Sequence, residues 1–380
     1  MLGQKIKTVH QPRGLVSKNV HPTPLKMSTT KNKQGIPVIT VDLDEPASTR
    51  WIKPGRKIAR LANELTDSMV KLCATYLPTS IRPLLNKPSL LLSLLAKLPC
   101  QALLGDLMEE AKGLSKGTGI PAPLLALANC TYDATQYMNG TSPTACSAAV
   151  YHNKSGAPSM IRYMDWAVPK GIGRYTVQVD YVRDGVHAYS SLGFAGFLGV
   201  ITAMSPSWAL AFNQAPAARV RKSILGSPAT YAARQACDAS ETFQDLKQEI
   251  STVRAFTPFL ALLCGDEKGQ VARIERPMHG RATVAKPNDG RPLPLTNHYI
   301  HRSHRKFNSE FEWEDEDGKA WFNDTQDRLC TVEEIAHGCR KKDHLPAFRE
   351  LKRLPVYYYN TVHLAALCPA SGEFKYTVKK

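Results

Sequence analysis

The chain has 380 residues, of which 43% are hydrophobic and 22% are charged, an ordinary globular composition with enough length for one large domain or two. Nine cysteines are scattered without Cys-x-x-Cys pairs or zinc-finger spacing, so a reduced compartment is favoured over a disulfide scaffold. Neither the apolar core of a signal peptide nor an uninterrupted membrane-spanning stretch is visible in the sequence. These features favour a cytoplasmic location.

The net charge of +16 is unevenly placed, because residues 1–41 carry seven lysines and arginines and no acidic residue precedes Asp42. We expect residues 1–35 to form a disordered basic tail that either contacts an anionic membrane surface or only aids solubility. Aromatic residues do not interleave with these charges, so no nucleic-acid partner is expected.

Residues 36–145 are expected to form a helix-rich segment that opens with one strand. Alternating apolar residues predict a strand over 36–44, and apolar residues at helical spacing predict a helix over 51–73. The leucine-rich stretch 88–107, interrupted by Lys97 and Pro99, favours burial in a core over a surface for a membrane or a fatty ligand.

Two short helices are predicted next, over 106–113 and 121–133, with the glycine-rich stretch 113–119 ending the first of them. The polar stretch 136–144 is expected to be an exposed loop, where a cut in the chain would be tolerated.

Residues 146–380 are expected to form a second part of the chain, in which strands predominate. Alternation and turn residues predict strands over 174–182, 186–192, 198–204, 208–213, 258–264, 270–275, 293–298, 361–367 and 374–378. Helices are predicted over 228–239, 242–253 and 327–337. This order of elements predicts an α+β fold in which sheets pack on one another with helices outside.

Cys146 starts a strand-like run that a turn at 153–156 joins to a second run containing Arg162 and Asp165. The resulting hairpin would return both residues to the side of Cys146. If the chain were cut before Cys146, this residue would supply a thiol nucleophile and, in its new α-amino group, a base with a pKa of about 7.7–8.0. A guanidinium would favour the thiolate, and a carboxylate could hold the amine. An ordinary hairpin with a buried cysteine fits the spacing too.

Two asparagines and one arginine stand out among the polar residues of later segments. Asn213 and Asn297 lie in apolar runs, where a side-chain amide is either satisfied within the sheet or donates hydrogen bonds to an oxyanion. Arg328, on the predicted late helix, is most simply a solvated charge.

Three histidines have a spacing that invites a metal site, at positions 298, 301 and 304. The basic residues around them would repel a cation, which favours ordinary surface histidines. We therefore expect no metal.

Three motifs in order resemble a known family. The segments Cys146-Ser147-Ala148, Arg162-Tyr163-Met164-Asp165-Trp166 and Leu295-Thr296-Asn297 resemble the N-terminal-nucleophile (Ntn) amide hydrolases that include cholylglycine hydrolase, penicillin V acylase, acid ceramidase and N-acylethanolamine acid amidase. Those enzymes usually carry Asn where this chain has Tyr163. The strand near residue 38 and the pair Arg50-Trp51 resemble the ceramidase and acylethanolamine amidase branch.

The resemblance covers residues 36–380 and implies a four-layer αββα Ntn-hydrolase sandwich with an N-terminal helical segment. It also implies self-cleavage between Ala145 and Cys146 into two fragments that stay associated. The residues that match catalytic positions are Cys146, Arg162, Asp165, Asn213, Asn297 and Arg328. Cys146 would act as nucleophile and base, Arg162 would support the thiolate, and Asp165 would orient the amine. Asn213 and Asn297 would support the oxyanion. Arg328 matches a late arginine of the family only loosely.

The function that the resemblance implies is cofactor-free hydrolysis of an N-acylated amine, such as an N-acylethanolamine or a ceramide-like lipid, through a thioester. An acyltransferase, or an acylase acting on penicillin V, bile salts or acyl-homoserine lactones, would use the same machinery. The non-enzyme alternative is a module that binds lipid or an anionic surface through the basic tail and the leucine-rich stretch.

Overall fold

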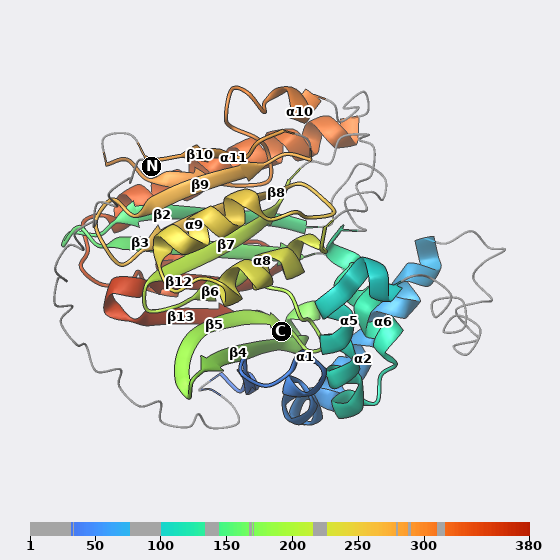
Figure 1. Cartoon of the computed structure of the whole chain (residues 1–380). Helices are drawn as coiled ribbons and strands as arrows, with labels where there is room; N and C mark the ends of the chain where they lie inside the picture. Colours follow the sequence, from blue (N-terminus) through green and yellow to red (C-terminus); the bar gives the residue numbers. More distant parts are fainter. Residues whose placement is uncertain are drawn as a thin grey trace, which may run out of the picture.

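The computed structural model describes residues 32, 34–76, 100–133, 144–166, 169, 171–215, 226–278, 280–287, 290–309 and 316–380. The predictions for the basic tail, for most of the leucine-rich stretch and for the loop over 136–143 lie outside these ranges. Within them, two β-sheets pack against each other and helices lie on their outer faces (Figure 1).

The larger sheet has eight strands in the order β1-β4-β5-β6-β7-β8-β9-β10. Strand β1 runs parallel to β4, and the other neighbours are antiparallel. The N-terminal segment therefore contributes an edge strand to a sheet built otherwise from residues after 175. The bounds are β1 (Val38–Asp42), β4 (Thr176–Arg183), β5 (Val186–Phe194), β6 (Thr202–Met204), β7 (Trp208–Gln214), β8 (Phe259–Gly265), β9 (Val271–Arg276) and β10 (Thr283–Ala285).

The smaller sheet has five antiparallel strands in the order β11-β2-β3-β12-β13. Its central hairpin is the one predicted around Cys146. The bounds are β11 (Leu293–Leu295), β2 (Thr144–His152), β3 (Pro158–Trp166), β12 (Thr361–Cys368) and β13 (Glu373–Val378).

The two-residue period of the strands separates the layers of the fold. In β7, Ala209 and Ala211 join the apolar cluster between the sheets, whereas Leu210 joins the cluster on the outer face. In β2, Ala148 likewise faces inward and Ala149 faces outward. Helices α8 (Ala229–Asp238) and α9 (Phe243–Thr252) cover the outer face of the larger sheet, and α11 (Glu316–Cys339) covers that of the smaller one. The layers follow the order αββα, which confirms the predicted α+β class.

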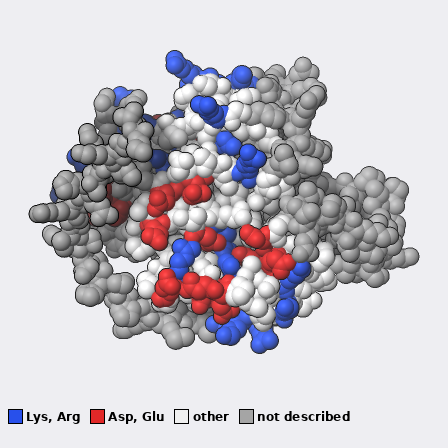
Figure 2. Space-filling model, viewed as in Figure 1, with Lys and Arg blue, Asp and Glu red and all other residues white. Residues whose placement is uncertain are grey.

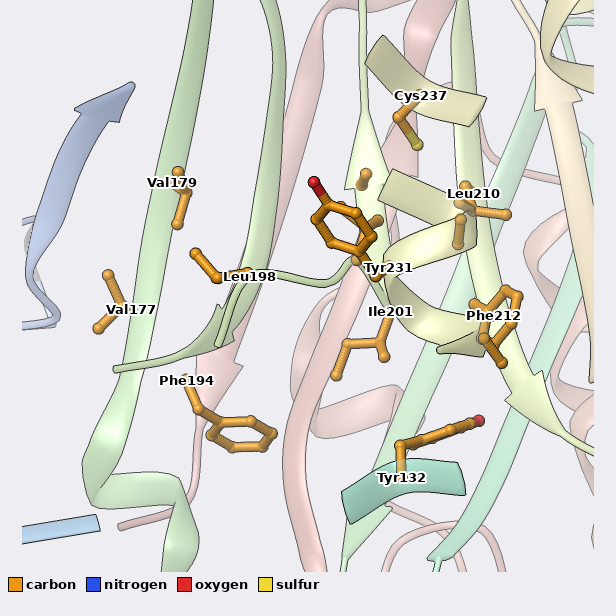
Figure 3. Close-up of a cluster of buried hydrophobic side chains, with 14 of the residues drawn as sticks. Tyr132, Val177, Val179, Phe194, Leu198, Ile201, Leu210, Phe212, Tyr231 and Cys237 are labelled. Carbon is orange, nitrogen blue, oxygen red and sulfur yellow. The ribbon is translucent and has the colours of Figure 1, made fainter. Parts of the chain in front are cut away.

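The core between the larger sheet and its covering helices is rich in aromatic side chains. In Figure 3, Tyr231 and Cys237 of α8 lie over Leu210 of β7, while Tyr132 points toward Phe212. The rings of Tyr132 and Phe212 have centroids 6.0 Å apart. Each such fully buried side chain contributes roughly 1.5–3 kcal/mol to folding.

The N-terminal helices pack beside the β1 end of the larger sheet (Figure 1). Their bounds are α1 (Ala47–Arg50), α2 (Ile52–Tyr76), α5 (Cys100–Thr118) and α6 (Ala122–Asn129). The prediction that a helix ends near Gly113 is wrong, because α5 continues to Thr118. A Cβ on Gly117 would stand 2.5 Å from the carbonyl oxygen of Ile52, so the missing side chain permits close contact between α2 and α5.

Several predicted elements have different lengths in the structure. The strand predicted over 293–298 is limited to Leu293–Leu295. Helix α11 begins at Glu316, eleven residues before its predicted start at 327. Strand β6 begins at Thr202 and not at 198, because Val200 donates its backbone hydrogen bond to Thr230 of α8 and not to a strand. The remaining short helices are η1 (Ile172–Tyr175), α10 (Lys306–Ser309), α12 (Phe348–Leu351) and η2 (Pro369–Ser371). None of the helices in the described ranges is long and apolar enough to span a membrane.

Candidate active site

The β2–β3 hairpin brings the predicted residues together, as the sequence indicated. Cys146 pairs with Met164, Ala148 pairs with Arg162, and Ala145 pairs with Asp165. Because side chains alternate along a strand, Cys146 and Arg162 face the layer between the sheets, and Asp165 faces α11.

Arg162 lies beside the sulfur of Cys146 and is fully buried. Its Nη2 donates to Cys146 Sγ at 3.2 Å and to the carbonyl oxygen of Phe212 at 2.9 Å. Its Nη1 donates to Asn213 Oδ1, and its Nε donates to the hydroxyl of Thr202 at 3.4 Å. These four acceptors include no carboxylate, so the positive charge remains available to stabilise a negative charge on the sulfur.

Thr202 and His363, two residues that the sequence did not indicate, hold Arg162 in place through a chain of hydrogen bonds. The hydroxyl of Thr202 lies 3.0 Å from Nε2 of His363, which is fully buried on β12. Burial, and then the charge of Arg162, lower the pKa of His363 to about 3, so its ring is neutral. Nε2 can then accept the proton of the Thr202 hydroxyl, whose oxygen accepts from Arg162. Both residues stand in ordinary apolar strands, so the sequence pattern offers no signal for them.

Two asparagines form hydrogen bonds with the backbone of Cys146. The N–H of Cys146 donates to Asn297 Oδ1 at 2.7 Å, and Asn297 Nδ2 donates to the carbonyl oxygen of Gln214 at 2.9 Å. Asn213 Nδ2 donates to the carbonyl oxygens of Cys146 at 3.2 Å and Thr296 at 2.7 Å. In the uncleaved chain these amide N–H groups therefore bond main-chain carbonyls, and the oxyanion role of both asparagines stays a prediction.

Arg328 is part of the same network. The interpretation as a solvated charge is wrong, because the side chain is fully buried where α11 packs on the smaller sheet. Its Nη1 donates to the carbonyl oxygen of Cys146 at 3.0 Å, to Ser147 Oγ at 3.1 Å and to Asn297 Oδ1 at 3.3 Å. Its Nε bonds Asp324 at 2.7 Å, one turn earlier on α11. Since Arg328 and the Cys146 N–H both donate toward Asn297 Oδ1, the orientation of that amide is fixed.

Asp165 is fully buried next to Ala145, the residue before the predicted cut. Burial raises the pKa of Asp165 to about 7, although the hydroxyl of Thr361 and the charges of Arg328 and Arg162 act in the opposite direction. At neutral pH the carboxyl group is therefore partly protonated in the uncleaved chain. A nearby ammonium group would lower this pKa and favour the carboxylate.

The predicted cleavage position lies inside a paired strand. Strand β2 begins at Thr144, and Ala145 and Cys146 are 8% and 1% exposed. The bond between them is therefore already part of the sheet and lies beyond the end of the polar stretch that was expected to be a loop.

An apolar crevice lies next to the site, between α2, α6 and the residues that follow β3 and β5. Its lining includes Leu65, Leu125, Trp166 and Phe194 around a cavity of about 40 Å³. Trp166 directly follows Asp165 on β3, so this strand connects the crevice to the site.

The three histidines around position 301 do not form a metal centre. His298 and His304 are 6% and 5% exposed, so the interpretation as surface histidines is wrong for both. Burial, and then nearby arginines, lower the pKa of His298 to about 4, and His304 Nδ1 lies 3.6 Å from Glu275. Among the residues with described positions, no group of three or more potential ligands could hold a metal ion.

Comparison with known proteins points to one group of amidases. No family model matches the chain. An N-acylethanolamine-hydrolyzing acid amidase of Caenorhabditis elegans is 23% identical over 253 residues, covering 64% of this chain and 68% of the relative. The acid ceramidase of Homo sapiens is 22% identical over 265 residues, covering 63% of each protein, and that of Bos taurus is 23% identical over 289 residues, covering 67% of this chain and 69% of the relative.

A solved structure of the C. elegans N-acylethanolamine-hydrolyzing acid amidase ortholog matches at a TM-score of 0.47 and 20% identity, over 59% of this chain and 93% of that one. The alignment spans less than two thirds of the human ceramidase. N-acylethanolamine-hydrolyzing acid amidase and acid ceramidase are homologues of this chain, which confirms the resemblance given by its three motifs.

Proposed function

We propose that this chain is an autoprocessed N-terminal-cysteine amidase that hydrolyses the linear amide bond of an N-acylated amine. One observation carries the proposal: the buried Cys146 has Arg162 3.2 Å from its sulfur, while Asn297, Asn213 and Arg328 bond its backbone. A structural cysteine needs none of these partners. The homologues named above, an amidase and a ceramidase, act on bonds of this kind.

Self-cleavage would create the active form. The Cys146 thiolate attacks the carbonyl carbon of Ala145, the bond from that carbon to Cys146 N breaks, and the nitrogen takes up a proton. Water then hydrolyses the thioester, which leaves a carboxylate on Ala145 and a free α-amine on Cys146. Because this bond lies within β2, an intramolecular reaction reaches it more easily than an external protease does.

The same sulfur would then attack the substrate. The α-amine takes the thiol proton and gives it to the departing amine, so that a thioester forms, and water releases the acid. Asn297 Oδ1, 2.7 Å from the Cys146 nitrogen in the uncleaved chain, would hold the new amine together with Asp165. Asn213 would support the oxyanion once its N–H groups turn from the main chain toward the substrate.

The acyl group of the substrate would enter the crevice beside Trp166 and Phe194. Its apolar lining suits a fatty chain, and its volume of about 40 Å³ requires the crevice to open when such a chain binds. We include two further points in this proposal. The basic tail would contact a membrane surface, and cleavage at 145/146 would divide the chain into a helix-rich part and a catalytic core. The two parts would stay associated because β1 pairs with β4 in one sheet.

Release of free fatty acid from an N-acylethanolamine and from a ceramide tests the function directly. Purified wild type, Cys146→Ala and Cys146→Ser are incubated with each substrate, with penicillin V and an acyl-homoserine lactone as comparison substrates. We expect turnover by wild type and none by Cys146→Ala. Added amine would divert the acyl group to a new amide if the protein is an acyltransferase. Lipid binding without turnover in wild type, unchanged in Cys146→Ala, would replace the proposal by a binding module.

A further inference from the structure

A basic cavity of about 820 Å³ lies at the end of the β2–β3 hairpin that is far from Cys146. Strand β2 runs from the nucleophile to His152 in the cavity wall, six residues or roughly 20 Å away. The cavity is therefore separate from the candidate active site.

Five lysines and arginines from four segments converge on this cavity. Lys154 lies on the β2–β3 turn, Lys268 on the β8–β9 turn, Lys286 after β10, and Arg340 and Lys341 after α11. None of the described lining residues is acidic. Lys154 lies 3.8 Å from Asp343, whose largely exposed carboxylate screens that lysine only weakly.

Elsewhere on the surface the charge is mixed. On the face in Figure 2, acidic side chains gather across the middle, over α9 and the β4–β5 hairpin, and Lys and Arg lie mainly toward its margins. The positive charge is therefore not spread evenly over the surface. A concave site with five cations is a distinct feature of this protein.

Hydrogen bonds join several of the segments that line the cavity to one another. Lys154 N donates to the carbonyl oxygen of Lys342 at 3.1 Å, which ties the β2–β3 turn to the end of α11. Gly269 N lies 3.4 Å from Nε2 of His152, which ties the β8–β9 turn to the same strand. When Nε2 accepts that proton, Nδ1 carries the proton of the neutral ring.

A purely structural explanation accounts for only part of this cluster. Cations at the C-terminal end of α11 complement the partial negative charge of a helix end, which explains Arg340 and Lys341. It does not explain why Lys154, Lys268 and Lys286, from three other segments, face the same space. Their mutual repulsion in a concave site favours an anion between them.

We propose that this cavity binds a multiply phosphorylated small molecule or headgroup. A single phosphate would leave most of the five positive charges unbalanced, and 820 Å³ lies within the range of ligand sites. Arg340 suits bidentate contact with a phosphate, and the lysines suit point contacts. No Phe, Tyr or Trp is among the described lining residues, so a nucleobase would find no aromatic stacking there. An inositol polyphosphate, free or as the headgroup of a lipid, has the matching chemistry.

The proposal is tested by titrating the full-length chain with three kinds of probe. These are inorganic phosphate, a soluble inositol trisphosphate, and phosphatidylcholine vesicles that contain or lack a phosphoinositide. Wild type is compared with Lys268→Glu/Lys286→Glu and with Lys53→Glu/Lys57→Glu, which makes the same charge change on exposed residues of α2. We expect saturable binding of the trisphosphate, much tighter than that of phosphate. The cavity pair should weaken it about a hundredfold, since each lost charge-assisted bond costs about tenfold or more.

Binding of the soluble trisphosphate identifies a free ligand. Binding only to vesicles that contain the phosphoinositide identifies a lipid headgroup. In either case, loss of binding in Lys268→Glu/Lys286→Glu supports the proposed site. Equal loss in both pairs, or no saturable binding to any probe, overturns it. Circular dichroism confirms that each variant is folded. Because binding does not require Cys146, failure here would leave the proposed amidase activity untouched.

Discussion

Removal of the Asp165 carboxyl group should change how the stability of the uncleaved chain depends on pH. The measurement uses Cys146→Ala as the parent, which cannot cleave itself, and Cys146→Ala/Asp165→Asn as the variant. Burial raises the pKa of Asp165 to about 7 from an ordinary value of 3.8. As pH rises from 4 to 7, the unfolded chain therefore loses this proton first, while the folded chain retains it.

The sign and size of the effect follow from this difference. Because the folded state binds more protons in that interval, its stability falls as pH rises. A difference of about three pKa units corresponds to about 4 kcal/mol between pH 4 and pH 8, at 1.36 kcal/mol for each unit. The Asp165→Asn variant loses this slope. Burial also shifts the pKa values of Asp133 and His363. Both residues titrate in parent and variant, so their contributions cancel in the difference between the two free energies of unfolding.

Urea unfolding followed by tryptophan fluorescence at pH 4, 5, 6, 7 and 8 gives the free energy of unfolding of both proteins. Relative to the variant, the parent should lose about 4 kcal/mol of stability across the series. A stability difference that is constant with pH would mean that Asp165 ionises normally, and would refute the account of its burial.

Two further substitutions test the packing around the site. Thr202→Val should cost about 1–3 kcal/mol and slow self-cleavage, because it leaves the Nε of Arg162 without its acceptor, whereas Thr202→Ser should retain most of both; urea unfolding and cleavage rates measure this. Gly199→Ala should cost about 1–3 kcal/mol, because its Cβ would stand 2.5 Å from Thr230 Oγ1. Gly338→Ala, which meets open space on α11, should be neutral or stabilising, and an equal loss at both positions in thermal unfolding would contradict the packing argument.

The sequence predicted the parts of the fold that depend on local pattern. The alternation of apolar and polar side chains, together with the turn residues, was sufficient to predict the β2–β3 hairpin. The hairpin in turn predicted that Arg162 lies beside Cys146. The continuation of α5 through Gly113 and Gly117 could not be predicted, because those glycines are explained by the helices packed against them and not by their own chain.

Contacts between distant strands were also beyond local pattern. The support of Arg162 by Thr202 and His363 joins β3, β6 and β12 across two sheets. Arg328 follows Asp327 on a predicted helix and therefore resembles a surface charge in the sequence. It is buried because α11 packs on the smaller sheet. Residues whose role depends on sheet-to-sheet packing carry no periodic signal of their own.

The central claim, that Cys146 becomes an N-terminal nucleophile, is tested most directly by intact mass. Purified wild type and Cys146→Ala are incubated side by side from pH 4 to pH 8, and the fragments are sequenced from their N-termini. We predict that only wild type divides into two fragments and that the larger begins at Cys146. A folded wild type that keeps its full length at every pH would contradict the claim, because the free α-amine would never form.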